Sequence, residues 1–199
     1  MGRKSLKEIR QKEILQVFYQ VAQEEGLENT SFAKIASKMD INPSLIIHYF
    51  KSREDMILAL IDFIVDQYKS IYQVNHHKSK KPLDQLLGVI DNIFSREWNM
   101  LFADSVFYSC FALIFRNEII RQKYKELHEF LRGSLAVYIQ QCNEEGSLSI
   151  KDAHHSADLI FLLSDGAYYY LSMIDDPKEY QDKLMNYKKE ALNLLGLSK

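Results

Sequence analysis

The amino-acid sequence predicts an all-α protein in which a small N-terminal helical domain precedes a larger helical body. Apolar residues recur at helical spacing over long stretches, and only 7 glycines and 3 prolines interrupt the 199 residues. The segment 31–50 contains two short helical patterns separated by a tight turn. The length allows one or two domains with a sizeable core.

Residues 31–39 predict the first helix of a helix-turn-helix motif. Ser31 is a favoured N-cap residue. The apolar residues that follow share one stripe at helical spacing: Phe32, Ile35, Ala36 and Met39. Asp40 tolerates a left-handed backbone better than most residues, and we expect Ile41 to anchor the turn in the core.

We expect the second helix of the motif to begin at Asn42 and Pro43. Asparagine is a common N-cap residue, and proline at the first helical position loses no hydrogen bond that the helix needs. Ile46 and Phe50 form the inner face. The residues left wholly or partly outside are Ser44, Leu45, Ile47, His48 and Tyr49. An ordinary αα-hairpin would leave the outer apolar residues unexplained, whereas a helix-turn-helix presents such a mixed face.

From Leu15 to about Leu60 the chain resembles the TetR family of bacterial transcriptional repressors. The resemblance rests on Gly26 at the end of the first helix, on Ile35-Ala36, and on the runs NPSLIIHYF and KSREDM. It implies a homodimeric repressor that holds a DNA operator and releases it when a small molecule binds.

The chain departs from the pattern of this family at three positions. Asp40 stands where the family usually has glycine, and Ile47 stands where it often has a tyrosine that touches phosphate. Arg53 replaces the usual lysine. These departures concern single DNA contacts and leave the helix-turn-helix module intact.

Charge is distributed unevenly along the chain. The net charge is −2, but residues 1–53 carry nine Lys and Arg against six Asp and Glu, and the remainder carries sixteen against twenty-one. A basic head on an acidic body concentrates the attraction for DNA at one end.

We expect DNA contacts from the motif and from basic residues on both sides of it. Ser44 and His48 have groups that hydrogen-bond phosphates or base edges, and Leu45 has an apolar side chain that packs on a thymine methyl. The N-terminal segment is either a phosphate-binding arm or simply a solvated terminus. The expected set is Arg3, Lys4, Ser31, Phe32, Asn42, Pro43, Ser44, Leu45, Ile47, His48, Tyr49, Lys51 and Arg53. Because a two-fold dimer reads two half-sites, we expect a pseudo-palindromic double-stranded operator.

Residues 1–51 are predicted to form the DNA-binding domain, and residues 52–199 a helical bundle for ligand binding and dimerisation. The first helix is expected over residues 6–25, with Ile9, Leu15, Phe18, Val21 and Ala22 facing inward. Ser52 to Asp55 has a capping-box pattern that opens a long helix. Further helices are expected over 53–72, 82–98, 117–146, 152–174 and 177–195, with a loop over 74–81.

The stretch from Met100 to Phe115 is apolar and aromatic almost all round, which predicts burial on every side. Bulky rings on several helices favour a pocket for a small apolar ligand, neutral or cationic, since few Lys or Arg fall among them. The expected lining is Trp98, Phe102, Phe107, Tyr108, Phe111, Tyr138, Tyr168 and Tyr169. The alternative is a solid core, in a DNA-binding protein that has no small-molecule inducer and is controlled by a partner protein or acts architecturally.

The last two helices carry more apolar surface than one small body buries. By resemblance to the family, they pair with their copies as a four-helix bundle. The expected interface residues are Leu159, Leu163, Ala167, Tyr170, Leu184 and Tyr187.

No pattern in the sequence indicates an enzyme. It contains no Gly-rich nucleotide loop, no HExxH and no GxSxG, so we expect neither catalytic residues nor a cofactor. The doublets His76-His77 and His154-His155 lack the spacing of metal ligands, and no metal is expected. Cys110 and Cys142 are expected to be buried free thiols. Because no apolar run approaches a membrane span and residues 1–12 are polar, we expect a cytoplasmic protein with no membrane contact.

Overall fold

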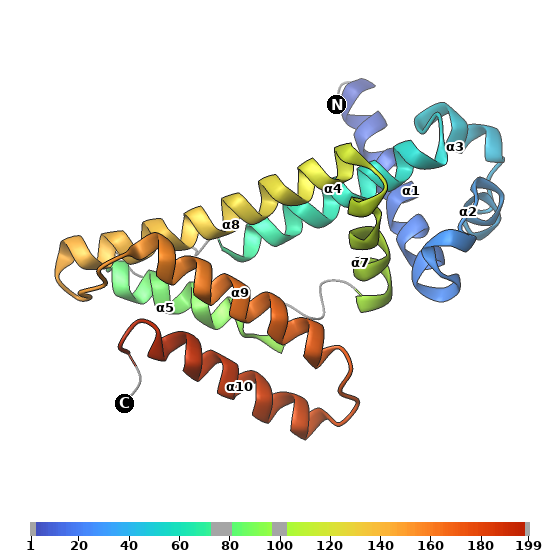
Figure 1. The fold of residues 1–199 in the computed structure, drawn as a ribbon. Coiled ribbons are helices and arrows are strands. Elements are labelled where there is room, and N and C mark those ends of the chain that lie inside the picture. Colours follow the sequence, from blue (N-terminus) through green and yellow to red (C-terminus); the bar gives the residue numbers. More distant parts are fainter. Residues whose placement is uncertain (1–2, 73–80, 97–102, 198–199) are drawn as a thin grey trace. The chain divides into compact units, whose positions relative to one another are not determined.

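The computed structural model describes residues 3–72, 81–96 and 103–197, and all of their regular elements are helices (Figure 1). The predicted all-α fold class is confirmed. The chain divides into two compact units, residues 1–66 with 102–124 and residues 67–101 with 125–199. The functional division at residue 51 stays a prediction.

The first unit begins with three helices and a short 3-10 turn. These are α1 (Arg3–Glu25), η1 (Leu27–Asn29), α2 (Phe32–Met39) and α3 (Pro43–Tyr49). The helix α4 (Arg53–Ile71) follows them. Side chains from different helices meet in a core that excludes solvent, including Ile14, Phe18, Ile35 and Ile46. Burial of such side chains stabilises the head by about 1.5–3 kcal/mol each.

The inner face of α1 agrees with the prediction at Phe18, Val21 and Ala22 and differs from it at Ile9 and Leu15. Ile9 is exposed and Leu15 is half-buried, whereas Ile14 is fully buried. The buried stripe contains Ile14, Phe18, Val21 and Ala22, at the i, i+4, i+7 and i+8 spacing of one helix face. The stripe continues from Phe18 toward the N-terminus to Ile14, and Ile9 is on a different face of the helix.

Capping groups fix the ends of the two short helices as predicted. The Oγ of Ser31 accepts a hydrogen bond from the Lys34 N–H at 3.3 Å, and Oδ1 of Asn42 accepts one from the Ser44 N–H at 2.9 Å. Pro43 is the first residue of α3. At the start of α4, Ser52 and Asp55 form the reciprocal pair of a capping box, with bonds of 3.1 and 3.0 Å.

Asp40 forms the turn between α2 and α3 in the left-handed conformation that the sequence predicted, with φ 52° and ψ 46°. Among the described residues, no other non-glycine residue has a positive φ. The N–H of Ile41 bonds back to the carbonyl of Ala36 at 3.0 Å, which completes a Schellman ending. The turn therefore determines the direction in which α3 leaves α2.

Replacing Asp40 tests the strain in this turn. Asp40→Gly should raise the free energy of unfolding by about 0.5–1 kcal/mol, because glycine adopts the left-handed region at no steric cost. Asp40→Val should lower it by about 1–2 kcal/mol. Urea titration measures both changes. Asp40→Asn is the control that removes the charge and keeps a tolerant backbone, and a valine variant as stable as wild type would contradict the assignment.

The apolar stretch before residue 116 is less buried than predicted. Residues 100–102 lie outside the described residues. The helix α7 (Asp104–Phe111) fully buries only Val106 and Cys110, and the 3-10 turn η2 (Ala112–Phe115) leaves Phe115 80% exposed. The prediction of all-round burial is wrong here because α7 is short and packs one side on α1 and η1. The N–H of Ala103 donates to the hydroxyl of Tyr19 at 2.6 Å.

The second unit contains most of the remaining helices. These are α5 (Pro82–Ile93), most of α8 (Glu118–Glu145), α9 (Ala153–Leu171) and α10 (Pro177–Asn193). The predicted starts and ends hold for α8, α9 and α10 within a few residues, but α5 ends at Ile93 instead of continuing to residue 98. Residues 73–80, which include most of the predicted loop, lie outside the described residues.

Contacts within the second unit join α5, α9 and α10. The Tyr168 hydroxyl on α9 bonds to the carbonyls of Ile93 and Ser95 at 2.6 and 3.1 Å. Lys188 on α10 pairs with Asp91 on α5 at 2.8 Å. Among these helices, α9 and α10 pack against each other most extensively. Both polar contacts therefore connect α5 to the last two helices.

Both cysteines are buried and free, as predicted. Burial raises the pKa of the Cys110 thiol to about 12, so this group stays protonated and weakly reactive. In the described residues, none of the helices combines the length and the hydropathy that crossing a bilayer requires.

Candidate nucleic-acid interface

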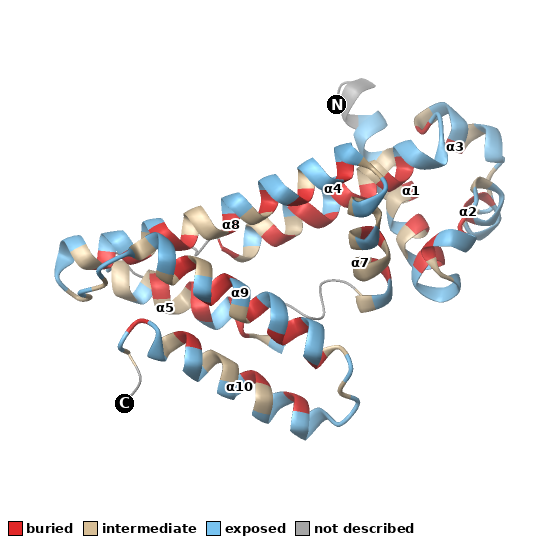
Figure 2. Ribbon diagram, in the orientation of Figure 1, coloured by how far each residue is buried: buried red, intermediate tan, exposed pale blue. Residues whose placement is uncertain are grey.

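The outer face of α3 presents side chains of mixed chemistry. Ser44 and His48 are exposed, and Ile47 is 47% exposed although it is a large apolar residue. On the opposite face Ile46 is fully buried, and Phe50 behind it is 4% exposed. One face of α3 therefore packs against the rest of the N-terminal domain, and the other face is free to contact another molecule (Figure 2).

The helix α3 packs on both α1 and α2, and further contacts join these three helices or lie within α3 itself. The side-chain amide of Gln11 donates to the carbonyl of Tyr49 at 3.4 Å, where α3 ends. Lys38 on α2 pairs with Glu24 on α1 at 2.6 Å. The ring of Tyr49 meets the ring of His48 edge to face, with centroids 5.2 Å apart. These contacts restrict the orientation of the exposed face.

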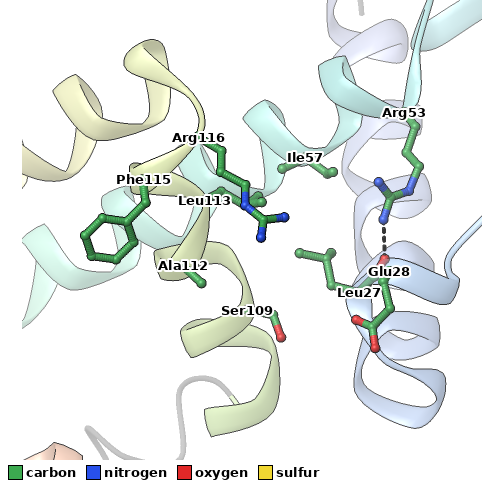
Figure 3. A pocket seen from close by; sticks show the side chains of 9 residues that line it. All are labelled: Leu27, Glu28, Arg53, Ile57, Ser109, Ala112, Leu113, Phe115 and Arg116. Atoms are coloured by element: carbon green, nitrogen blue, oxygen red, sulfur yellow. Dashed lines mark hydrogen bonds between the residues drawn. The ribbon is translucent and has the colours of Figure 1, made fainter.

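Arg53 contacts the head itself. Its Nε donates to the carbonyl of Thr30 at 3.2 Å, and its Nη2 donates to the carbonyl of Leu27 (Figure 3). Both acceptors belong to the connection between α1 and α2. The side chain predicted to touch phosphate therefore also ties the start of α4 to η1, a role that sequence reasoning missed.

The other residues predicted at DNA have varied surroundings. Arg3 and Lys4 lie in the first turn of α1 and not in an extended arm, and their side chains fall outside the described part. Lys51 is exposed and makes no ion pair with a described residue. Asn42, Pro43 and Ser31 are exposed, whereas Phe32, Leu45 and Tyr49 are half-buried.

The described residues predicted to line a ligand pocket are distributed over both units, and the pocket stays a prediction. Phe107, Tyr108 and Phe111 belong to the first unit, where the rings of Phe107 and Phe111 stack 6.3 Å apart. Tyr138, Tyr168 and Tyr169 belong to the second unit. Trp98 and Phe102 lie outside the described residues.

In the second unit the three predicted ligand tyrosines differ in exposure. Tyr168 is buried, and burial raises the pKa of its hydroxyl. The half-buried Tyr138 donates to the carbonyl of Tyr72 at 3.4 Å, and Tyr169 is largely exposed. Each hydroxyl therefore meets a different environment.

The predicted dimer residues separate into buried and open positions. Ala167 and Leu184 are 5% and 1% exposed within a single chain, so they belong to its internal packing and not to an open surface. Leu159 and Tyr170 are exposed, and Leu163 and Tyr187 are half-buried. Lys183 lies over the Tyr170 ring at 5.4 Å.

Sequence reasoning missed an apolar stripe on α9. Leu162 and Tyr169 are 59% and 61% exposed and lie seven residues apart on one face of α9, and Met173, in the turn after the helix, is 59% exposed. Gly166 lies between them on the same face, and a Cβ added there would meet nothing within 4 Å. The seven-residue spacing of Leu162 and Tyr169 in the sequence was the available signal.

These features define a class of protein. A left-handed turn between two short capped helices, with the second helix exposed on a basic head, is the arrangement of a helix-turn-helix DNA-binding regulator. The profile of "Bacterial regulatory proteins, tetR family" matches residues 14–60, and that of "Tetracyclin repressor-like, C-terminal domain" matches residues 81–197. The chain belongs to the TetR family of bacterial transcriptional regulators.

Known proteins similar to the chain agree with this assignment. An HTH-type transcriptional regulator of Staphylococcus aureus (strain USA300) is 33% identical over 98 residues, 45% of this chain and 52% of that protein. The chain therefore spans about half the length of the curated relatives it matches.

Two solved structures have the same fold. A TetR transcription regulator from Haloarcula marismortui ATCC 43049 has a TM-score of 0.82 and 18% identity, covering 96% of this chain and 98% of that one. A transcriptional regulator from Saccharomonospora viridis, solved in complex with choline, has a TM-score of 0.74 and 17% identity, with 90% and 95% covered.

Proposed function

We propose that the chain is a homodimeric repressor that binds a pseudo-palindromic DNA operator through α3 and releases it when a small ligand binds. The observation that carries the DNA-binding part is the outer face of α3. Its exposed side chains stand on a helix whose inner face is fully buried. A helix of this kind fits the major groove.

The chemistry of this face suits base edges and phosphates together. Ser44 and His48 have groups that hydrogen-bond to bases or phosphate oxygens, and Ile47 packs on an apolar surface such as a thymine methyl. The exposed Lys51 contributes a phosphate contact. Two copies related by a two-fold axis would place their α3 helices about 34–36 Å apart, one turn of DNA.

The dimer would form through the last two helices. Leu162 and Tyr169 on α9, with Met173 in the turn after it, supply exposed apolar surface, and Gly166 permits close approach of a second backbone. Leu159 and Tyr170 extend the same surface. Burial of this surface against its copy supplies the free energy of association.

The ligand in this proposal is a small apolar molecule, neutral or cationic, held by aromatic rings. Aromatic faces attract cations, and choline in the Saccharomonospora viridis structure is a cation of this kind. Ligand binding acts only through a difference in affinity between the DNA-binding and released conformations.

Two observations favour the alternative, a DNA-binding protein without a small-molecule inducer that a partner protein controls or that acts architecturally. The rings of Phe107 and Phe111 pack edge to face on Tyr124, with centroids 6.4 and 5.3 Å away. The Tyr168 hydroxyl is occupied by two main-chain carbonyls. Rings and hydroxyls that already contact other parts of the chain are less available to a ligand. A screen of apolar amines and neutral aromatics for loss of operator affinity distinguishes the two functions.

Replacing His48 tests the DNA-binding face. After bound genomic fragments identify the operator, His48→Ala should weaken operator binding about tenfold or more, because one good base contact contributes about 1–3 kcal/mol. The melting temperature should fall only slightly, since the side chain is exposed and loses a single ring contact, with Tyr49. His154→Ala, at an exposed histidine of the second unit, is the matched control. Equal operator affinity and preference in wild type and His48→Ala would remove α3 from the proposed interface.

A further inference from the structure

A cavity of about 560 Å³ lies within the first unit (Figure 3). One wall comes from η1 and the start of α4, and the other comes from α7 and η2. The volume is within the range of about 300–1,000 Å³ that is usual for small-molecule sites. None of the residues predicted to line a ligand pocket borders this cavity.

The lining combines apolar surface with an excess of positive charge. Leu27, Ile57 and Leu113 supply apolar side chains from both walls. The charged groups are two guanidinium groups, on Arg53 and Arg116, and the carboxylate of Glu28. The cavity therefore has a net charge of about +1 at neutral pH.

Arg116 has the side chain most available to a ligand. It extends from the end of η2 toward the opposite wall, and its guanidinium has no ion pair or hydrogen bond with the described residues (Figure 3). Arg53 uses Nε and Nη2 on main-chain carbonyls, and a guanidinium has five N–H donors in total. Both arginines therefore retain donors for an anion.

We propose that this cavity binds a small monoanionic carboxylate with an apolar body. The carboxylate accepts hydrogen bonds from Arg116 and from the remaining N–H groups of Arg53, which suit its planar geometry. The apolar body lies on Leu27, Ile57 and Leu113. Because Glu28 repels a second negative charge, the site selects monoanions over dianions and phosphate. This chemistry differs from the neutral or cationic ligand proposed for the aromatic residues.

Binding at this cavity would also regulate the head, a consequence that rests on the proposed function. One wall contains Arg53 and Ile57 of α4, directly after the helix-turn-helix, and the other contains η2. A ligand that touches both walls favours one spacing between them. It also neutralises positive charge near the DNA-binding face, so we expect it to lower operator affinity.

Calorimetry on the full chain tests the site without DNA. Naphthalene-2-carboxylate should bind, and its amide should bind about tenfold more weakly or worse, as should inorganic phosphate. Arg116→Gln should weaken carboxylate binding about ten- to hundredfold, because a charge-assisted hydrogen bond is lost. Ala112→Phe should weaken it similarly by filling the cavity from an exposed position. Arg121→Gln, which removes an exposed arginine outside the cavity, should leave binding unchanged.

The outcomes separate this site from the proposed function. Equal binding of carboxylate and amide, unchanged binding by Arg116→Gln, or no binding to wild type at millimolar concentration would overturn the site. Melting curves confirm that each variant is folded. Operator binding is then measured with and without naphthalene-2-carboxylate. If the protein binds the carboxylate but no operator, the proposed repressor function is wrong and the proposed site stands. If naphthalene-2-carboxylate leaves operator affinity unchanged, the proposed regulation is wrong.

Discussion

Leu162→Glu combined with Met173→Glu should produce a monomer that no longer holds the operator. Leu162 on α9 and Met173 in the turn after it are both exposed, so the replacements do not disturb the interior of one chain. In the proposed dimer they would bury four glutamates, and an unpaired buried charge costs about 3–5 kcal/mol. We expect the dimer dissociation constant to rise by about a hundredfold or more.

Sedimentation at micromolar concentration measures the change in oligomeric state. Val137→Glu is the matched control, because Val137 on α8 is also an exposed apolar residue of the second unit and lies off α9. The control should stay dimeric and bind the operator. A wild-type protein that sediments as a monomer, or a double variant that stays a dimer, would contradict the proposed interface.

Arg53→Ala should lower both the stability of the protein and its affinity for the operator. The change removes the hydrogen bonds from the guanidinium to the carbonyls of Thr30 and Leu27. Hydrogen bonds to charged groups contribute about 1.5–3 kcal/mol, so the free energy of unfolding should fall by about that amount. Arg53→Lys should recover only part of the loss, because an ammonium group does not reproduce the planar fork of a guanidinium.

The two measurements separate a structural role of Arg53 from a phosphate contact. Lys51→Ala is the control, since Lys51 is exposed and makes no ion pair with the described residues. It should weaken binding to all DNA sequences alike and reduce the slope of the salt dependence by about one, with an unchanged melting temperature. If Arg53→Ala behaves in the same way as Lys51→Ala, its contacts with the main chain do not stabilise the head.

Local chemistry made the helix-turn-helix predictable from sequence. The caps at Ser31 and Asn42 and the left-handed residue Asp40 each depend on a few neighbouring residues, and all three lie in the structure as predicted. The same holds for the capping pair of Ser52 and Asp55. Such signals depend on the chemistry of nearby side chains and little on the rest of the fold.

Burial was harder to predict because it depends on partners distant in the sequence. Phe115 follows an apolar run, but it is exposed because η2 presents only part of its surface to other helices. Ala167, which is predicted at a dimer interface, is 5% exposed within one chain, and the burial of this small side chain depends on the packing of neighbouring helices; the interface itself stays a prediction. The link from Arg53 to Leu27 joins residues 26 positions apart, and no local pattern indicates it.

The length of α3 has a consequence for the dynamics of the head. At seven residues, α3 is shorter than the roughly 12–15 residues that an isolated helix needs in water. It therefore persists only while Ile46 and Phe50 remain packed on α1 and α2, and the amide protons of α2 and α3 should exchange with solvent deuterium as one cooperative unit. The surface proposed to read DNA is thus lost whenever this unit opens locally, even while the rest of the chain stays folded.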